Sequence, residues 1–236
     1  MKIIMNIARY IFIICLPFLL LTVVIAGAVN CSWVYTHGFE KYNIRQSLAD
    51  TGLELTKADM ADIARGFIRY WNSSEEFINL NVRQQGKTVA FFNTEEIIHF
   101  KDVKGLFRLD YAVLLGTFLY CLAFGLVSIF WNKGGNRKTL AKATLWGSGI
   151  TLGLVLLLGI GTLTDFNNLF YQFHLLVFTN QFWSAEGNML LLFPDGFWYD
   201  AATYCVLAIA GLAVVLGGLS WIYLGGEKRK SHLLQT

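Results

Sequence analysis

Four apolar runs without a charged residue constrain this chain more than any other feature of its sequence. Each is at least as long as the roughly 20 residues that a helix needs to cross the hydrocarbon core of a bilayer. The runs are Tyr10–Asn30, Tyr111–Trp131, Ala143–Thr164 and Ala201–Gly226. Only 15% of all residues are charged, against about 25% in a typical soluble domain. The sequence therefore predicts an all-α membrane protein with four transmembrane helices, at 10–30, 110–131, 143–164 and 201–226. We expect the first to be a retained anchor, because its uncharged stretch far exceeds that of a signal peptide.

The distribution of charge predicts an orientation in the membrane. Residues 1–9, the 132–142 loop and the 227–236 tail together contain nine lysines and arginines and one acid. Residues 165–200 contain four acids and no lysine or arginine. Because basic loops stay in the cytoplasm, both termini and the 132–142 loop are predicted to be cytoplasmic, and residues 31–109 and 165–200 to lie outside. The net charge of +3 gives no indication of nucleic-acid binding.

The stretch LFYQFHLLVFTNQFW, residues 169–183, is apolar but contains a histidine, two glutamines and an asparagine. These polar groups are costly in lipid. A fifth crossing would also move the basic tail to the outside. We therefore expect residues 165–200 to form an interfacial or re-entrant segment on the outer face rather than a span.

Residues 31–109 are richer in charge and predict a small, mainly helical extracytoplasmic cap. Thr56 and Asp59 form a capping box that opens a helix, on which Met60, Ile63 and Phe67 make an apolar stripe suited to packing within the cap or on the membrane surface. The residues around Gly86 favour a short hairpin or an extended piece, and the sequence leaves the fold of residues 72–93 open.

A second capping box, Asn93 with Glu96, predicts a short helix that ends near Gly105, just before the second span. His99 and Asp102 stand three residues apart on this helix and so share a face, where the carboxylate can orient the imidazole.

Two of the four histidines, His99 and His174, are expected at the same level, where the outer segments meet the membrane. A titratable residue at membrane depth is a functional candidate by default. His37 and His232 are expected to be incidental.

The residue types around these histidines favour acid–base chemistry. There is no G-x-S-x-G motif, and Ser184 is the nearest serine in the second outer segment. A metal site needs three or four ligands; His99, Asp102, His174 and Asp195 could supply them, but no tight ligand spacing supports it. We expect no metal and no cofactor. Two histidines without a protein nucleophile suit a substrate that brings its own nucleophile.

Three short motifs carry a resemblance to a known family. They are HFKDVK at 99–104, FHxxxFxNxxW at 173–183 and FPxxFW at 193–198. Their order and topological level resemble those of the bacterial lipoprotein intramolecular transacylases, and the four-span plan with an outer cap is similar along essentially the whole chain.

The resemblance implies a plasma-membrane acyltransferase acting on diacylglyceryl-modified bacterial lipoproteins among membrane lipids. Such an enzyme moves the sn-2 acyl chain to the α-amino group of the modified cysteine, giving a lyso-form lipoprotein. On this view His174 is the base, His99 with Asp102 is the acid or its orienting partner, and these roles could be exchanged. Asn180 or an indole N–H would hydrogen-bond the oxyanion. The expected substrate-binding residues are Phe100, Phe173, Phe178, Asn180, Trp183, Phe193, Phe197 and Trp198.

Two other classes stay open on the sequence. One is a non-enzymatic accessory membrane protein whose cap binds a lipid or a peptide. The other is a metal-dependent lipid hydrolase.

Overall fold

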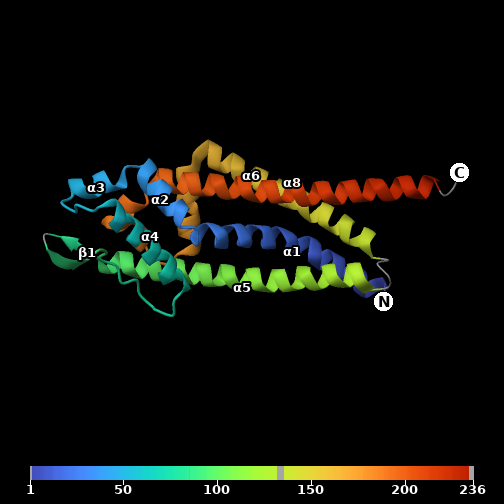
Figure 1. The fold of residues 1–236 in the computed structure, drawn as a ribbon, viewed down its shortest axis with the longest axis horizontal. Coiled ribbons are helices and arrows are strands. Elements are labelled where there is room, and N and C mark those ends of the chain that lie inside the picture. Colours follow the sequence, from blue (N-terminus) through green and yellow to red (C-terminus); the bar gives the residue numbers. More distant parts are fainter. Residues whose placement is uncertain (1, 85, 132–135, 234–236) are drawn as a thin grey trace. The chain divides into compact units, whose positions relative to one another are not determined.

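The protein is described by a computed structural model that covers residues 2–84, 86–131 and 136–233 (Figure 1). Part of the expected 132–142 loop and the side chain of His232 lie outside this description. The elements are α1 (Lys2–Val29), α2 (Ser32–Lys41), α3 (Ile44–Asp50), α4 (Lys57–Asn72), β1 (Asn81–Gln84), β2 (Lys87–Ala90), α5 (Thr94–Phe130), α6 (Arg137–Val177), a 3₁₀ turn (Phe182–Ser184), α7 (Asn188–Leu192) and α8 (Asp195–Leu233).

The chain divides into two compact units, which are treated separately below. The bundle unit consists of Met1–Ile25, Asp110–Ile160 and Tyr204–Thr236. The aromatic unit consists of Ala26–Leu109 and Gly161–Thr203. Both proposed catalytic histidines belong to the aromatic unit.

Four of the described helices are long and apolar enough to cross a membrane: Ile4–Val29, Thr94–Phe130, Arg137–Val177 and Asp195–Glu227. The predicted helical architecture with four candidate spans is therefore confirmed, while the extracytoplasmic position of the remaining residues stays a prediction.

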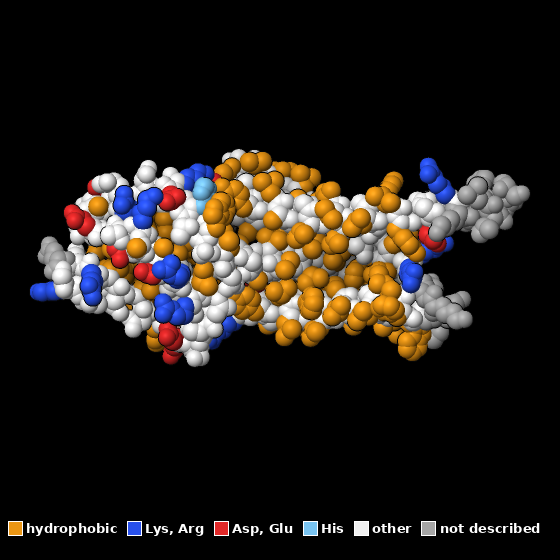
Figure 2. Space-filling model, viewed as in Figure 1, with side chains coloured by type: hydrophobic (Ala, Val, Ile, Leu, Met, Phe, Trp, Pro, Cys, Tyr) orange, Lys and Arg blue, Asp and Glu red, His pale blue; other side chains and the backbone are white. Residues whose placement is uncertain are grey.

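Apolar side chains cover the outside of the bundle unit, as Figure 2 shows for one face of its long helices. Leu157 exposes 68% of its surface and Ile222 71%. Exposed apolar area is unfavourable in water, at about 25 cal/mol per Å², and this cost disappears in lipid. Inside the unit, the Phe12 and Phe124 rings lie 4.9 Å apart, so that α1 packs on α5.

Helix α5 corrects one expectation from the sequence. Gly105 does not end a short helix, because α5 is continuous from Thr94 to Phe130. The space around the Gly105 α-carbon is open, and the residue is not in a left-handed conformation. A single glycine in a helix costs only about 1 kcal/mol. Continuing the helix keeps every backbone donor and acceptor paired where the chain approaches lipid.

Helix α6 is interrupted at Asp165, whose φ of −156° and ψ of 78° are not helical. The Asp165 carboxylate accepts a hydrogen bond of 3.1 Å from the backbone N–H of Asn168. This is the bond that an N-cap residue makes, so Asp165 opens a new helical segment that ends at Val177. The segment that carries His174 is thus a capped helix, a form that its composition alone did not indicate.

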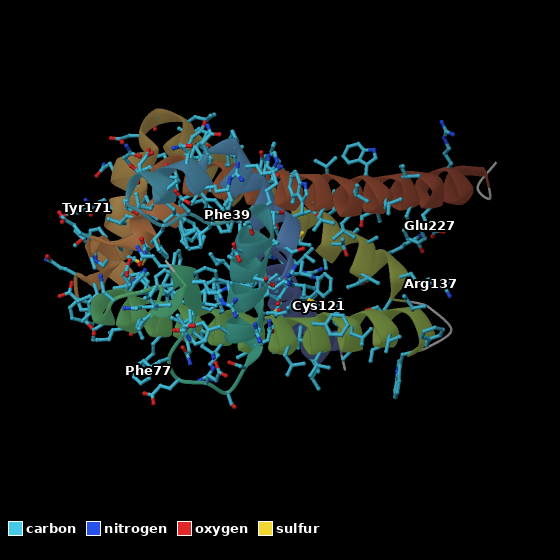
Figure 3. All side chains as sticks on the ribbon, turned by 60° about the vertical axis from the view of Figure 1, so that its left-hand side comes forward. Phe39, Phe77, Cys121, Arg137, Tyr171 and Glu227 are labelled. Carbon is cyan, nitrogen blue, oxygen red and sulfur yellow. The ribbon has the colours of Figure 1, made fainter. Side chains whose placement is uncertain are left out.

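The aromatic unit is built around a core of rings from several elements. Phe67 of α4 is fully buried and lies 5.2 Å from both Phe100 and Phe193. The predicted stripe of α4 is confirmed as core, since Met60 and Ile63 are also buried. The Thr56–Asp59 capping box is confirmed as well. In Figure 3, Phe39 of α2 points into this unit.

Of the two forms that the sequence left open around Gly86, the structure contains the hairpin. Strands β1 and β2 pair antiparallel, with Val82 opposite Val89. Gly86 lies in the turn with a φ of +78°, which a glycine adopts without steric cost.

Polar contacts join α2 to the start of α8 within the aromatic unit. The Lys41 ammonium lies 2.5 Å from the Asp200 carboxylate, and the Tyr42 hydroxyl donates to the Gly196 carbonyl at 2.7 Å. The Phe197 ring packs directly on the α-carbon of Gly38, where a β-carbon would lie 2.4 Å from the ring. These contacts position the beginning of α8 with its Phe197-Trp198 pair.

Candidate active site

His99 is placed near the start of α5 by a buried capping box. The backbone N–H of Asn93 donates to Glu96 Oε2 at 2.7 Å, and the N–H of Glu96 donates to Asn93 Oδ1 at 3.0 Å. Glu96 Oε1 also accepts from the backbone N–H of Met189 at 2.6 Å. Glu96 is 1% exposed, so its carboxylate is a buried link between α5 and α7. The second predicted capping box is therefore confirmed, with an additional partner.

His174 is held by its own helix. Its Nδ1 lies 2.7 Å from the Phe170 carbonyl oxygen. Because a carbonyl oxygen only accepts, Nδ1 must carry the proton, which leaves Nε2 of the neutral ring as a proton acceptor. The Phe170 ring packs against the imidazole at 4.3 Å.

The two imidazoles come together, as predicted. Their ring centroids are 6.2 Å apart, and His99 and His174 are 7% and 6% exposed. The Phe178 ring lies against both, at 5.0 Å from His99 and 5.4 Å from His174. Burial away from water disfavours the charged form of an imidazole. The pair is thus a set of two buried rings suited to exchanging protons with a bound molecule.

Asp102 makes a different contact from the one we expected. Its Oδ2 accepts a hydrogen bond of 2.8 Å from the Asn180 amide, and the buried Nδ1 of His99 has no hydrogen-bond partner. Asn180 Oδ1 in turn accepts from the backbone N–H of Phe182 at 3.0 Å. Asp102 and Asn180 therefore hold the turn that follows α6.

The predicted aromatic residues divide into two groups. Phe173, Phe178 and Trp183 lie against His174, at centroid distances of 5.3, 5.4 and 4.9 Å. The second group packs in the core: Phe100 contacts Phe67 and Phe92, while Phe193, Phe197 and Trp198 contact one another.

Two contacting residues were missed by the sequence reasoning. Phe170 provides both a ring and a carbonyl to His174, and its i−4 spacing on a helix could have revealed it. Tyr171, labelled in Figure 3, packs against Trp183 at 5.6 Å.

A buried lysine follows the histidine on α5. Lys104 is 2% exposed, donates to the Glu75 carbonyl at 2.6 Å and lies 4.0 Å from the centre of the Tyr70 ring. Burial raises the pKa of Tyr70 to about 12. Its hydroxyl therefore stays protonated and donates to the Glu76 carbonyl at 3.0 Å. Lys104 thus has a structural role in holding residues 73–76.

Four apolar helices and a buried histidine pair enclosed by rings define a class: a membrane protein with a candidate acid–base site. Among the residues that the structure describes, no three His, Cys, Asp or Glu side chains come together as metal ligands would.

Comparison with known proteins narrows this class. Residues 10–198 match the family of the lipoprotein intramolecular transacylase Lit. This chain belongs to that family, and it is an acyltransferase.

Individual relatives agree with the family match. An uncharacterized protein of Aquifex aeolicus is 25% identical over 186 residues, covering 77% of this chain and 74% of the relative. The solved structure of the membrane-integral transacylase Lit from Bacillus cereus is 22% identical and superposes with a TM-score of 0.78, covering 98% of this chain and 100% of that one. A variant of the same protein with one histidine replaced by alanine superposes with a TM-score of 0.73 over 97% of each chain.

Proposed function

We propose that this chain moves the sn-2 acyl chain of a diacylglyceryl-modified cysteine to the α-amino group of the same cysteine, leaving a lyso-form lipoprotein. The main support is the buried histidine pair, in which His174 is anchored through Nδ1 and keeps Nε2 for a proton. The family name, which specifies intramolecular acyl transfer in a lipoprotein, supports the same reaction.

The first step joins the amine to the ester. The amine attacks in its neutral form; its ordinary pKa is about 7.7–8.0, so deprotonation near neutral pH is easy. The nitrogen lone pair forms the C–N bond, and the carbonyl π electrons move onto the oxygen. His174 Nε2 accepts the proton that leaves the nitrogen.

The second step releases the glyceryl oxygen. The carbonyl forms again and the C–O bond to the sn-2 carbon breaks. The departing oxygen takes a ring proton from His99, which takes up the proton held by His174 in its place. Burial disfavours the charged form of His99, and Asp102, one helical turn away, opposes only part of this effect. Both rings are therefore neutral again at the end of the step. One acyl group and one proton exchange places, so the substrate mass does not change.

Holding the two reacting groups together supplies most of the rate enhancement in a unimolecular transfer. The rings of Phe173, Phe178 and Trp183 around His174 support this role, because they give an apolar surround for the ester and the amine.

We further propose that the aromatic unit is an extracytoplasmic cap on a bacterial plasma membrane. The charge distribution supports cytoplasmic termini and a cytoplasmic 132–142 loop. Alkaline phosphatase, which is active only outside the cytoplasm, should be inactive when fused after Thr236. An active fusion would contradict this orientation.

The reaction is tested by mass spectrometry of a reporter lipoprotein, co-expressed with this chain in a bacterium that lacks the activity. The expected product has an unchanged mass, an N-acylated cysteine and one acyl chain on the glyceryl group. His99→Gln and His174→Gln should each abolish it. His37→Gln is the matched control, because this histidine lies on α2 and stacks on Trp33.

Other outcomes identify the other classes. A product that has lost one acyl chain, in a reaction that chelators stop, identifies a metal-dependent hydrolase. An unmodified reporter identifies a binding protein. Full yield from both histidine variants would refute the site assignment while leaving the reaction intact.

A further inference from the structure

We infer that the indole N–H of Trp183 is the catalytic hydrogen-bond donor to the oxyanion that forms at the sn-2 carbonyl. The inference rests on the proposed transfer and deepens it by assigning a role that the reaction chemistry requires.

Two buried nitrogen atoms without a partner stand out in the described part of the aromatic unit. They are His99 Nδ1 and Trp183 Nε1. A buried polar atom without a partner is unfavourable by about 1–3 kcal/mol in general, and each such atom in a folded protein calls for an explanation. Both atoms belong to rings around His174, at centroid distances of 6.2 and 4.9 Å. The unpaired atoms thus gather at the proposed reaction centre.

The two atoms have complementary chemistry. A His99 nitrogen can carry a proton to a departing oxygen, whereas an indole nitrogen is a donor only and does not titrate. A fixed neutral donor is what a developing oxyanion needs, because it stabilises negative charge without giving up its proton. In a buried setting this stabilisation exceeds its value in water.

Asn180 fits the same role less well. Its amide already donates to the Asp102 carboxylate, and its oxygen accepts from the Phe182 N–H. An oxyanion bound at this amide would lie close to the negative charge of Asp102, and like charges repel. Asn180 is instead a positioning residue: it holds the turn in which Phe182 and Trp183 lie.

Neighbouring rings fix the Trp183 side chain in place. The Tyr171 ring meets the indole edge to face, with 5.6 Å between the ring centroids. The His174 ring is a second contact of the indole, at a centroid distance of 4.9 Å. A donor held in this way needs little reorganisation when charge develops, which is the condition under which such donors are most effective.

Two substitutions test the inference in the full-length protein, purified in detergent. Trp183→Phe removes the N–H, and replacement by β-(3-benzothienyl)alanine puts sulfur in place of the N–H while keeping the ring outline. Turnover is measured on a diacylglyceryl lipopeptide. Binding is measured as the Ki of the analogue with an ether at sn-2, which has no carbonyl oxygen. Trp33→Phe on α2 is the control for loss of an indole outside the site.

Both substitutions should lower kcat by about 100-fold or more and leave the Ki of the ether analogue unchanged. The inference is overturned if the benzothienyl variant keeps full turnover, or if Ki weakens in step with the loss of kcat, because the side chain would then act through shape alone. These results are separate from failure of the proposed function, in which the wild-type protein itself would give no N-acylated product.

Discussion

The Asn180 amide donates a hydrogen bond of 2.8 Å to the Asp102 carboxylate and thereby joins α5 to a turn 78 residues later in the chain. Through its other end, Asn180 holds the backbone of Phe182. The carboxylate that the sequence predicts as a partner of His99 instead helps to hold the turn that contains Trp183.

This contact predicts different effects for two substitutions of Asp102. Asp102→Asn keeps an oxygen that can accept from Asn180, whereas Asp102→Ala removes it. If the contact with Asn180 is the main role, Asp102→Ala should lower kcat about 10-fold, as expected for loss of one hydrogen bond, and Asp102→Asn should lower it much less. Steady-state assays on a lipopeptide measure both. Equal loss in the two variants would show that the negative charge near His99 matters more.

The buried carboxylate of Glu96 predicts a large effect on stability. Glu96→Gln keeps one acceptor oxygen but loses the other, which leaves the backbone N–H of Asn93 or Met189 unpaired. The unfolding free energy should fall by about 2 kcal/mol. Thermal unfolding in detergent measures this, and Glu95→Gln at the adjacent exposed position is the control. Equal melting temperatures for the two variants would contradict the proposed link between α5 and α7.

The close packing of Phe197 on Gly38 predicts that even a methyl group is too large there. A β-carbon at Gly38 would lie 2.4 Å from the ring, so Gly38→Ala should destabilise the protein by about 1–3 kcal/mol. Gly27→Ala is the matched control, since nothing beyond its chain neighbours and its own helical backbone lies within 4 Å of its β-carbon position. Adding Phe197→Leu to Gly38→Ala should recover part of the loss in melting temperature. No recovery would mean that the ring is not the obstacle.

The capping box of α4 predicts a pH dependence of stability. Hydrogen bonds from the Thr56 side chain and backbone lower the pKa of Asp59. A carboxyl whose folded-state pKa is lowered stabilises the fold above its unfolded value, about 3.9, and this contribution is lost as the pH falls through the folded value. Thr56→Ala should lower the unfolding free energy by about 1 kcal/mol at neutral pH. It should lower it by less in acid. A loss that stays constant between pH 6 and pH 3 would contradict this account.

Local patterns in the sequence predicted the elements whose causes are local. Both capping boxes and the hairpin at Gly86 depend on residues within a few positions of one another, and the structure contains all three. The length of α5 was not predicted. Gly105 was expected to end the helix, but the small cost of one glycine is outweighed when the helix continues for many residues on both sides of it.

The proximity of the two candidate histidines could be predicted from the sequence, but not all the contacts around them. Spacing showed that His99 and Asp102 share a helical face, yet it could not show that Asn180 would meet the carboxylate. The same limit applies to the rings: Phe193 and Trp183 occur in similar motifs, but one packs in the core and the other lies against His174. Only the tertiary arrangement separates these roles.

The contact of the Phe178 ring with both imidazoles has a consequence for competition between nucleophiles. Water is present at a far higher concentration than any single amine, so an open acid–base pair beside an ester would favour loss of a free fatty acid. The Phe178 ring packs against both histidines, and an apolar ring at this position disfavours water beside the pair. In the proposed transfer the tethered amine would then have the advantage over water, and the acyl chain that leaves the glyceryl oxygen would be retained by the lipoprotein.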